Sequence, residues 1–148
     1  MRDVKTLSAD DARRAIAAVR AAAERKGTSV VVAVADANGE LLALLRMDGA
    51  AAAEVAPAIA KAYTAARLER TTRALRTAAR HPQTGFDLAG FCDPRIVAEA
   101  GGVMVEHEGA VVGAVGVSGE TPDTDEALAE AGALAIKTAQ AGLSIQDA

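Results

Sequence analysis

The stretch SVVVAVADANGELLALLRM (residues 29–47) decides the fold, because it has the pattern of two strands joined by a tight turn. Its first half is a β-branched run that is too short for a helix. Asn38-Gly39 is the strongest short signal for a hairpin turn, and the run from Leu41 to Met47 fits the returning strand. The stretch therefore predicts an antiparallel hairpin.

A second hairpin is predicted over residues 101–117, with its turn at Glu108-Gly109. Gly113 and Gly116 lie inside its second strand. Because glycine weakens a strand unless something needs the space, we expect another element to pack closely against the backbone there.

Helices flank both hairpins. The first has Ser8 as its N-cap and Gly27 as a left-handed stop, with apolar residues recurring on one face between them. A second follows the first hairpin and either continues or bends as far as Arg80, and a last one begins near Thr121 or Asp123 and runs into the final residues. Because hairpins build antiparallel sheets, the fold class is α+β, with helices packed against the sheet.

Length and composition limit the function classes. A chain of 148 residues is the size of one domain, so we expect a single domain over residues 1–148. A net charge of −4 argues against bulk binding of nucleic acid. One cysteine cannot form an internal disulfide and suits a reducing compartment. With no secretory signal pattern and no apolar run long enough for a bilayer, we expect a cytoplasmic protein that has no membrane partner.

Aromatic residues are scarce: the chain has no Trp, one Tyr and two Phe. The core must therefore be built from small side chains, which let backbones approach closely. Few aromatic faces remain on which a nucleobase could stack, and the same scarcity argues against a flat cofactor held in an aromatic cage.

Three segments carry a resemblance to a known family. VADANGELLALLRMDGA (residues 34–50) resembles the signature of the GlcG/HbpS-like proteins, a strand ending in Asp, a Gly turn and a strand ending Arg-Met-Asp-Gly-Ala. KAYTA (61–65) resembles their Lys-Ala-x-Thr-Ala helix, and residues 101–119 followed by Asp125-Glu126 resemble their glycine-rich hairpin and last helix. The resemblance covers nearly the whole chain in the same order.

The resemblance implies a profilin-like α+β fold, assembly into homo-oligomers, and binding of haem or a related tetrapyrrole. Some members are described as haem-degrading or redox-sensing, and a related domain is attached to corrinoid-processing enzymes. This chain departs from the pattern at Met104, where the family commonly has Pro after Gly-Gly-Val. It also lacks the secretion signal of the extracellular haem binders, whose ligating residues lie outside the shared motifs. The resemblance therefore predicts the fold of this chain more directly than it predicts the function.

His81 and His107 are the two histidines, and histidine is the usual axial ligand of haem iron. Both are candidate metal ligands if haem is the cofactor. The alternative for His107 is an exposed polar residue beside a turn. The alternative for His81 is a cation at a helix C-terminus.

Two segments are candidate ligand-binding sites for a carboxylate or phosphate. Arg46, Asp48 and Gly49 end a strand and lead into a helix, whose free N–H groups favour an anion. Alternatively, Asp48 caps that helix and Arg46 pairs with an acid. The second candidate is the glycine-rich end of the later hairpin, although close strand packing explains its glycines equally well; its residues are Gly116, Ser118, Gly119 and Glu120.

Lys61 lies at the border of the apolar stripe of its helix. It is a candidate catalytic base or Schiff-base former, together with His107, and the alternative is an ion pair or a snorkelling side chain. A basic stripe follows along the chain, with arginines three or four residues apart. It could bind acidic ligand groups such as propionates, contact the acidic last helix of another subunit, or simply be a solvated helix face. Its members are Arg67, Arg70, Arg73, Arg76 and Arg80.

Three functions follow from these candidates. The first is a small-molecule-binding protein that resembles the tetrapyrrole binders of the family. The second is a small cofactor-independent enzyme that acts on an organic acid by proton transfer, with Lys61 or His107 as the base. The third is an oligomeric accessory protein without a ligand, whose sign would be the lack of any cavity.

Overall fold

The computed structural model describes residues 1–146. Its elements are α1 (Ala9–Lys26), β1 (Val31–Asp36), β2 (Leu41–Arg46), η1 (Ala52–Glu54), α2 (Val55–Leu68), α3 (Thr72–Ala79), η2 (Leu88–Phe91), β3 (Gly102–His107), β4 (Ala110–Ser118) and α4 (Pro122–Gln146). The expected continuation of the last helix into residues 147–148 lies outside the described residues. Among the helices of the described part, none has the length and apolar character needed to cross a membrane.

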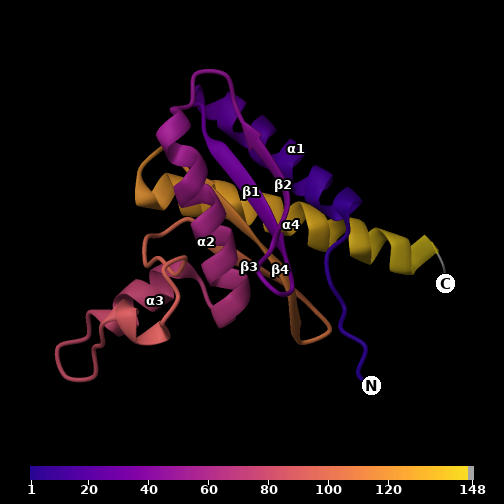
Figure 1. Cartoon of the computed structure of the whole chain (residues 1–148). Coiled ribbons are helices and arrows are strands. Elements are labelled where there is room, and N and C mark those ends of the chain that lie inside the picture. The colour runs from indigo at the N-terminus through magenta and orange to yellow at the C-terminus, as the bar shows by residue number, and fades with distance from the viewer. Residues whose placement is uncertain (147–148) are drawn as a thin grey trace.

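The sheet has four antiparallel strands in the order β2-β1-β4-β3, so each predicted hairpin forms one half of it. Helices α1 and α4 pack on one face, where β1 contributes Val32 and Val34. Helix α2 packs on the other face, against Val31 and Ala33 (Figure 1). The predicted α+β fold with helices against the sheet is confirmed.

Helix α1 begins and ends where its caps predict. The Ser8 side chain accepts a hydrogen bond from the Asp11 N–H, and the Asp11 carboxylate accepts one from the Ser8 N–H, which completes a capping box. Gly27 ends the helix with φ of 69°, a left-handed conformation that glycine adopts without strain.

The basic segment after α2 bends rather than continuing as one helix. Glu69 takes a left-handed conformation with φ of 53°, which ends α2. Thr71 then caps α3 by accepting a hydrogen bond from the Ala74 N–H, and Leu75 anchors α3 in the interior. Of the two expected courses for this segment, the structure shows the bend.

Helix α2 lies directly on the backbone of β4. A Cβ atom on Gly116 would stand 2.3 Å from the Ala58 carbonyl oxygen and 2.5 Å from the Ala62 nitrogen. Real Cβ atoms essentially never approach that closely. The glycine inside the strand is therefore explained by the close approach of α2, as the sequence predicts.

Replacing Gly116 with alanine should destabilise the protein strongly, because the added methyl group meets α2 backbone that has to move. We expect a loss of roughly 1–3 kcal/mol in the free energy of unfolding, the usual cost of overpacking. Urea unfolding measures it. Gly90→Ala is the matched control, since a Cβ there meets nothing within 4 Å. Equal stability of the two variants would contradict the packing argument.

Candidate functional site

An apolar cleft of about 480 Å³ lies between α2, the segment before β3 and the start of α4. This volume falls within the range of roughly 300–1,000 Å³ that is usual for small-molecule pockets. Small side chains leave the space open, because none of them reaches across it. The apolar wall consists of Ala56, Pro57, Ala60, Val97, Ala100 and Pro122.

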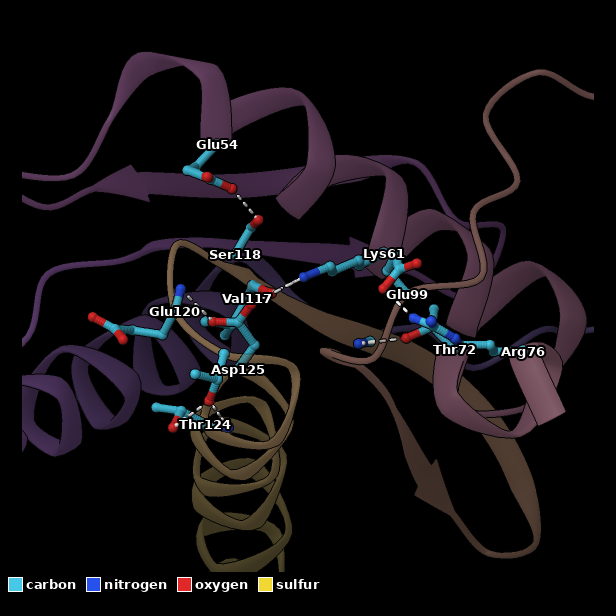
Figure 2. A network of polar contacts seen from close by, with 12 residues as sticks. Glu54, Lys61, Thr72, Arg76, Glu99, Val117, Ser118, Glu120, Thr124 and Asp125 are labelled. Carbon is cyan, nitrogen blue, oxygen red and sulfur yellow. Dashed lines mark hydrogen bonds and ion pairs between the residues drawn. The ribbon is translucent and has the colours of Figure 1, made fainter.

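A buried ion pair forms the floor of the cleft. The Lys61 amine donates to the Val117 carbonyl oxygen at 2.9 Å and to Asp125 Oδ2 at 3.1 Å (Figure 2). The two charged side chains are only 7% and 4% exposed. Of the alternatives for Lys61, the structure shows the ion pair.

Asp125 belongs to the first turn of α4 and turns back toward β4. Its second oxygen, Oδ1, accepts a hydrogen bond from the Glu120 N–H at 3.0 Å. Burial raises the pKa of the Asp125 carboxyl above its usual value, and the charge and hydrogen bond of Lys61 oppose that rise. The acid therefore holds the lysine in place instead of merely facing the positive end of α4.

Further acids surround the ion pair. Ser118 is buried, and its hydroxyl donates a short hydrogen bond to the Glu54 carboxylate (Figure 2). Glu99 and Glu120 line the cleft with Ser118. Glu99 turns to Arg76, at 2.5 Å. The candidates Ser118 and Glu120 therefore belong to the cleft, whereas Glu54 and Glu99 were not identified from the sequence.

A groove of about 400 Å³, which we call the arginine groove, adjoins the cleft and shares Ala100 and Pro122 with it. Its other lining residues are Arg73, Arg76, Thr77 and Arg80. Arg73 is held by Glu126 at 3.0 Å and Asp123 at 2.5 Å, so this arginine meets the acidic last helix of its own chain. Arg80 is exposed, and no ion pair joins it to the described part of the chain.

The other candidate anion site lies elsewhere. Arg46 and Asp48 line a separate hollow beside α1. Asp48 does not cap a helix, because η1 begins at Ala52 and its N-cap residue, Ala51, makes no side-chain hydrogen bond. The idea that Asp48 caps the following helix is therefore wrong.

Gly49, the third member of that candidate set, has φ of 90° and packs beside Ser29. Gly116 is covered by α2, as described above, so close packing accounts for it. Gly119 also has positive φ, 129°, and lies against Val30. Packing and chain reversal thus account for these three glycines without an anion.

The two histidines lie outside the cleft. His81 Nδ1 accepts hydrogen bonds from the N–H groups of Gln83 and Thr84. His107 ends β3 beside the start of β4, while Ser118 ends β4 at the cleft. A nine-residue strand separates them, roughly 26–30 Å. The structure therefore does not bring His107 and Lys61 together.

Removing one partner of the buried pair should cost far more than removing both. We expect Lys61→Met or Asp125→Leu to lower the free energy of unfolding by about 3–5 kcal/mol, because the remaining polar group is left buried without its partner. The double variant Lys61→Met/Asp125→Leu should recover part of that loss. Chemical denaturation of all three variants measures the coupling.

The exposed pair Arg20–Glu24, changed to alanine singly and together, is the matched control. Such surface pairs contribute about 0–1 kcal/mol. Strictly additive losses for Lys61 and Asp125 would show that the two side chains do not stabilise each other.

Comparisons with known proteins agree over most of the chain. Residues 7–134 match a family model described as haem degrading protein HbpS-like. Protein GlcG of Escherichia coli K12 is 39% identical over 112 residues, which is 76% of this chain and 81% of GlcG.

Solved structures share the fold. The crystal structure of Klebsiella pneumoniae protein ORFY superposes with a TM-score of 0.87 at 31% identity, covering 93% of this chain and 94% of that one. The crystal structure of a PduOC:heme complex gives a TM-score of 0.80 at 26% identity, covering 88% and 94%. The chain therefore belongs to the HbpS-like family, as the hairpin signature at residues 34–50 predicted.

Proposed function

We propose that the protein binds a haem-class tetrapyrrole in the apolar cleft. The observation that carries the proposal is the wall of the cleft. Its side chains, from α2 and from the segment before β3, are small and apolar, and they leave an open apolar surface. A large flat ring suits such a wall, because its faces bury apolar surface without needing aromatic partners. The family match and the related PduOC:heme complex support the choice of ligand.

The residues of the cleft fit the macrocycle better than its iron. Pro57, Ala60 and Val97 would hold the ring by apolar contact. None of the described residues that line the cleft is His, Cys, Met or Tyr, the side chains that usually hold haem iron. Bound haem would bring redox chemistry, and the chain's own contribution here is binding and the exclusion of water.

His81 is also poorly arranged as an iron ligand. A histidine that binds metal through Nε2 carries its proton on Nδ1. In this structure Nδ1 faces two N–H donors, from Gln83 at 3.2 Å and Thr84 at 3.1 Å. A proton on Nδ1 would face these two N–H groups, so the exposed imidazole would have to rotate away from them before His81 could bind iron through Nε2.

The alternative functions have less support. A proton-transfer enzyme needs a free base, whereas the Lys61 amine is bonded to Val117 and Asp125. An accessory protein without a ligand should have no cavity, whereas the cleft measures about 480 Å³. Tetrapyrrole binding uses the observed space and leaves the ion pair intact.

A haem titration followed by absorbance tests the proposal. We expect a Soret shift that saturates at one haem per chain, because the proposal places one ring in the cleft of each chain. Ala60→Trp should abolish the shift by filling the cleft, whereas Ala17→Trp on the exposed face of α1 should leave it unchanged. A broad change that never saturates and is the same in all proteins would mean nonspecific adsorption, and the proposal would fall.

The histidine variants give a second reading of the same titration. His81→Ala and His107→Ala should both keep the saturating shift, because neither residue lies in the cleft. Loss of the shift in one variant would instead identify that residue as the axial ligand and would move the site away from the cleft.

The proposal extends to partners and location. β2 is an outer strand whose run Leu41–Leu45 has no charge and no proline, the usual devices that block pairing at an edge. Leu41 is 47% exposed. These features support self-association through β2, and the single cysteine supports a cytoplasmic location.

Sedimentation velocity tests the self-association. We expect wild-type protein to sediment as a dimer or larger oligomer and Leu41→Lys to sediment as a monomer, because the introduced charge would be buried against the second copy. Leu134→Lys, at a residue 64% exposed on α4, is the matched control. A monomeric wild type, or dissociation by the control alone, would rule out the β2 interface.

A further inference from the structure

We infer that the site selects acidic tetrapyrroles by their carboxylates, through Arg76 and Arg80, and independently of the central metal. The inference rests on the proposed function and names the ligand class of the same cleft. Its starting point is that cleft and arginine groove share Ala100 and Pro122. A ring that lies against the apolar wall of the cleft would therefore direct the substituents on one of its edges into the arginine groove.

The arginines of the groove are fixed by the fold. Arg73 and Arg76 lie three residues apart on one side of α3, and Arg80 is the C-cap residue of that helix. The Thr71 cap and the buried Leu75 hold the helix in place. A hydrogen bond of 2.9 Å from the Gly102 N–H to the Thr72 hydroxyl ties α3 to the start of β3. The backbone that carries these arginines is therefore held at one end of the cleft before any ligand arrives.

The three arginines differ in what they already bind. Arg73 has two carboxylate partners on α4 and so serves the fold. Arg76 has one acidic partner, Glu99, which itself lines the cleft. Arg80 is exposed, and no ion pair of the described residues satisfies it. Arg76 and Arg80 are thus the cations that can take up ligand charge.

Ligand carboxylates would compete with Glu99. An arginine binds a carboxylate by two parallel N–H bonds, the strong geometry for this pair. One ligand carboxylate would replace Glu99 on Arg76 and a second would bind Arg80. Acids of the same chain already face Arg73 and Arg76, so Arg80 supplies the charge of the groove that has no acidic partner among the described residues. The apolar wall of the cleft and the arginine groove together match a ring that bears acidic side chains along one edge.

The central metal has no part in this recognition. Among the described residues, those that line the cleft offer no customary iron ligand, and the Lys61 amine is held by Val117 and Asp125. The affinity for a tetrapyrrole should therefore depend on the ring and its carboxylates, and not on the metal that the ring holds.

The experiment compares haem, iron-free protoporphyrin and protoporphyrin dimethyl ester, with binding measured by absorbance and by fluorescence of the iron-free rings. We expect haem and protoporphyrin to bind alike. The ester should bind roughly ten- to a hundredfold more weakly, because it loses charge-assisted hydrogen bonds. Arg80→Gln should weaken protoporphyrin by about tenfold and leave the ester unchanged, and Arg76→Gln should act in the same direction.

Arg25→Gln is the matched control, because this exposed arginine lies at the end of α1, on the opposite face of the sheet from α2. Failure of every porphyrin to bind wild-type protein would overturn the proposed function itself. Equal binding of acid and ester, or equal loss of both in Arg80→Gln, would overturn the carboxylate inference alone and leave the cleft as the binding site. Binding of haem without binding of protoporphyrin would show that the metal is recognised.

Discussion

The close contact between α2 and the backbone of β4 is the constraint on which the rest of the structure depends. It exists because Gly116 faces Ala58 and Ala62, where any larger side chain in the strand would separate the two elements. At that distance Lys61, one residue before Ala62, can reach the C-terminal end of β4. Its amine meets the Val117 carbonyl oxygen and the acid of α4. The packing of small residues thus determines where a buried charge can lie.

That buried charge in turn shapes the cleft. A Cβ on Gly101 would stand 2.9 Å from the Lys61 amine and 2.5 Å from the Val117 oxygen, so the glycine keeps room for the contact. The ion pair is nearly closed to water, and a broken pair of this kind is costly. The polar floor therefore stays fixed, while the alanines and prolines above it leave the space in which a ligand can lie.

The sequence predicted the features of the fold that depend on local residue patterns. The turn residues predicted both hairpins, and the caps Ser8 and Gly27 predicted the two ends of α1. The glycines inside β4 predicted that another element packs closely against that strand. The contacts of the site could not be predicted in the same way. Lys61 and Asp125 are 64 residues apart, and an acid in a first helical turn has the same local pattern whether it faces solvent or a buried lysine.

The histidines show why residue type alone is weak ground for assigning a ligand. Both are chemically suited to iron, yet His81 accepts two backbone N–H bonds and His107 lies at the far end of β4 from the cleft. Position, and not chemistry, sets them apart from the candidate cleft. The same reasoning separates Arg73, whose charge α4 neutralises, from Arg80 at the C-cap of the same helix. A family match carries the fold to this chain, whereas our proposal for the ligand rests on which side chains the fold leaves unsatisfied beside the cleft.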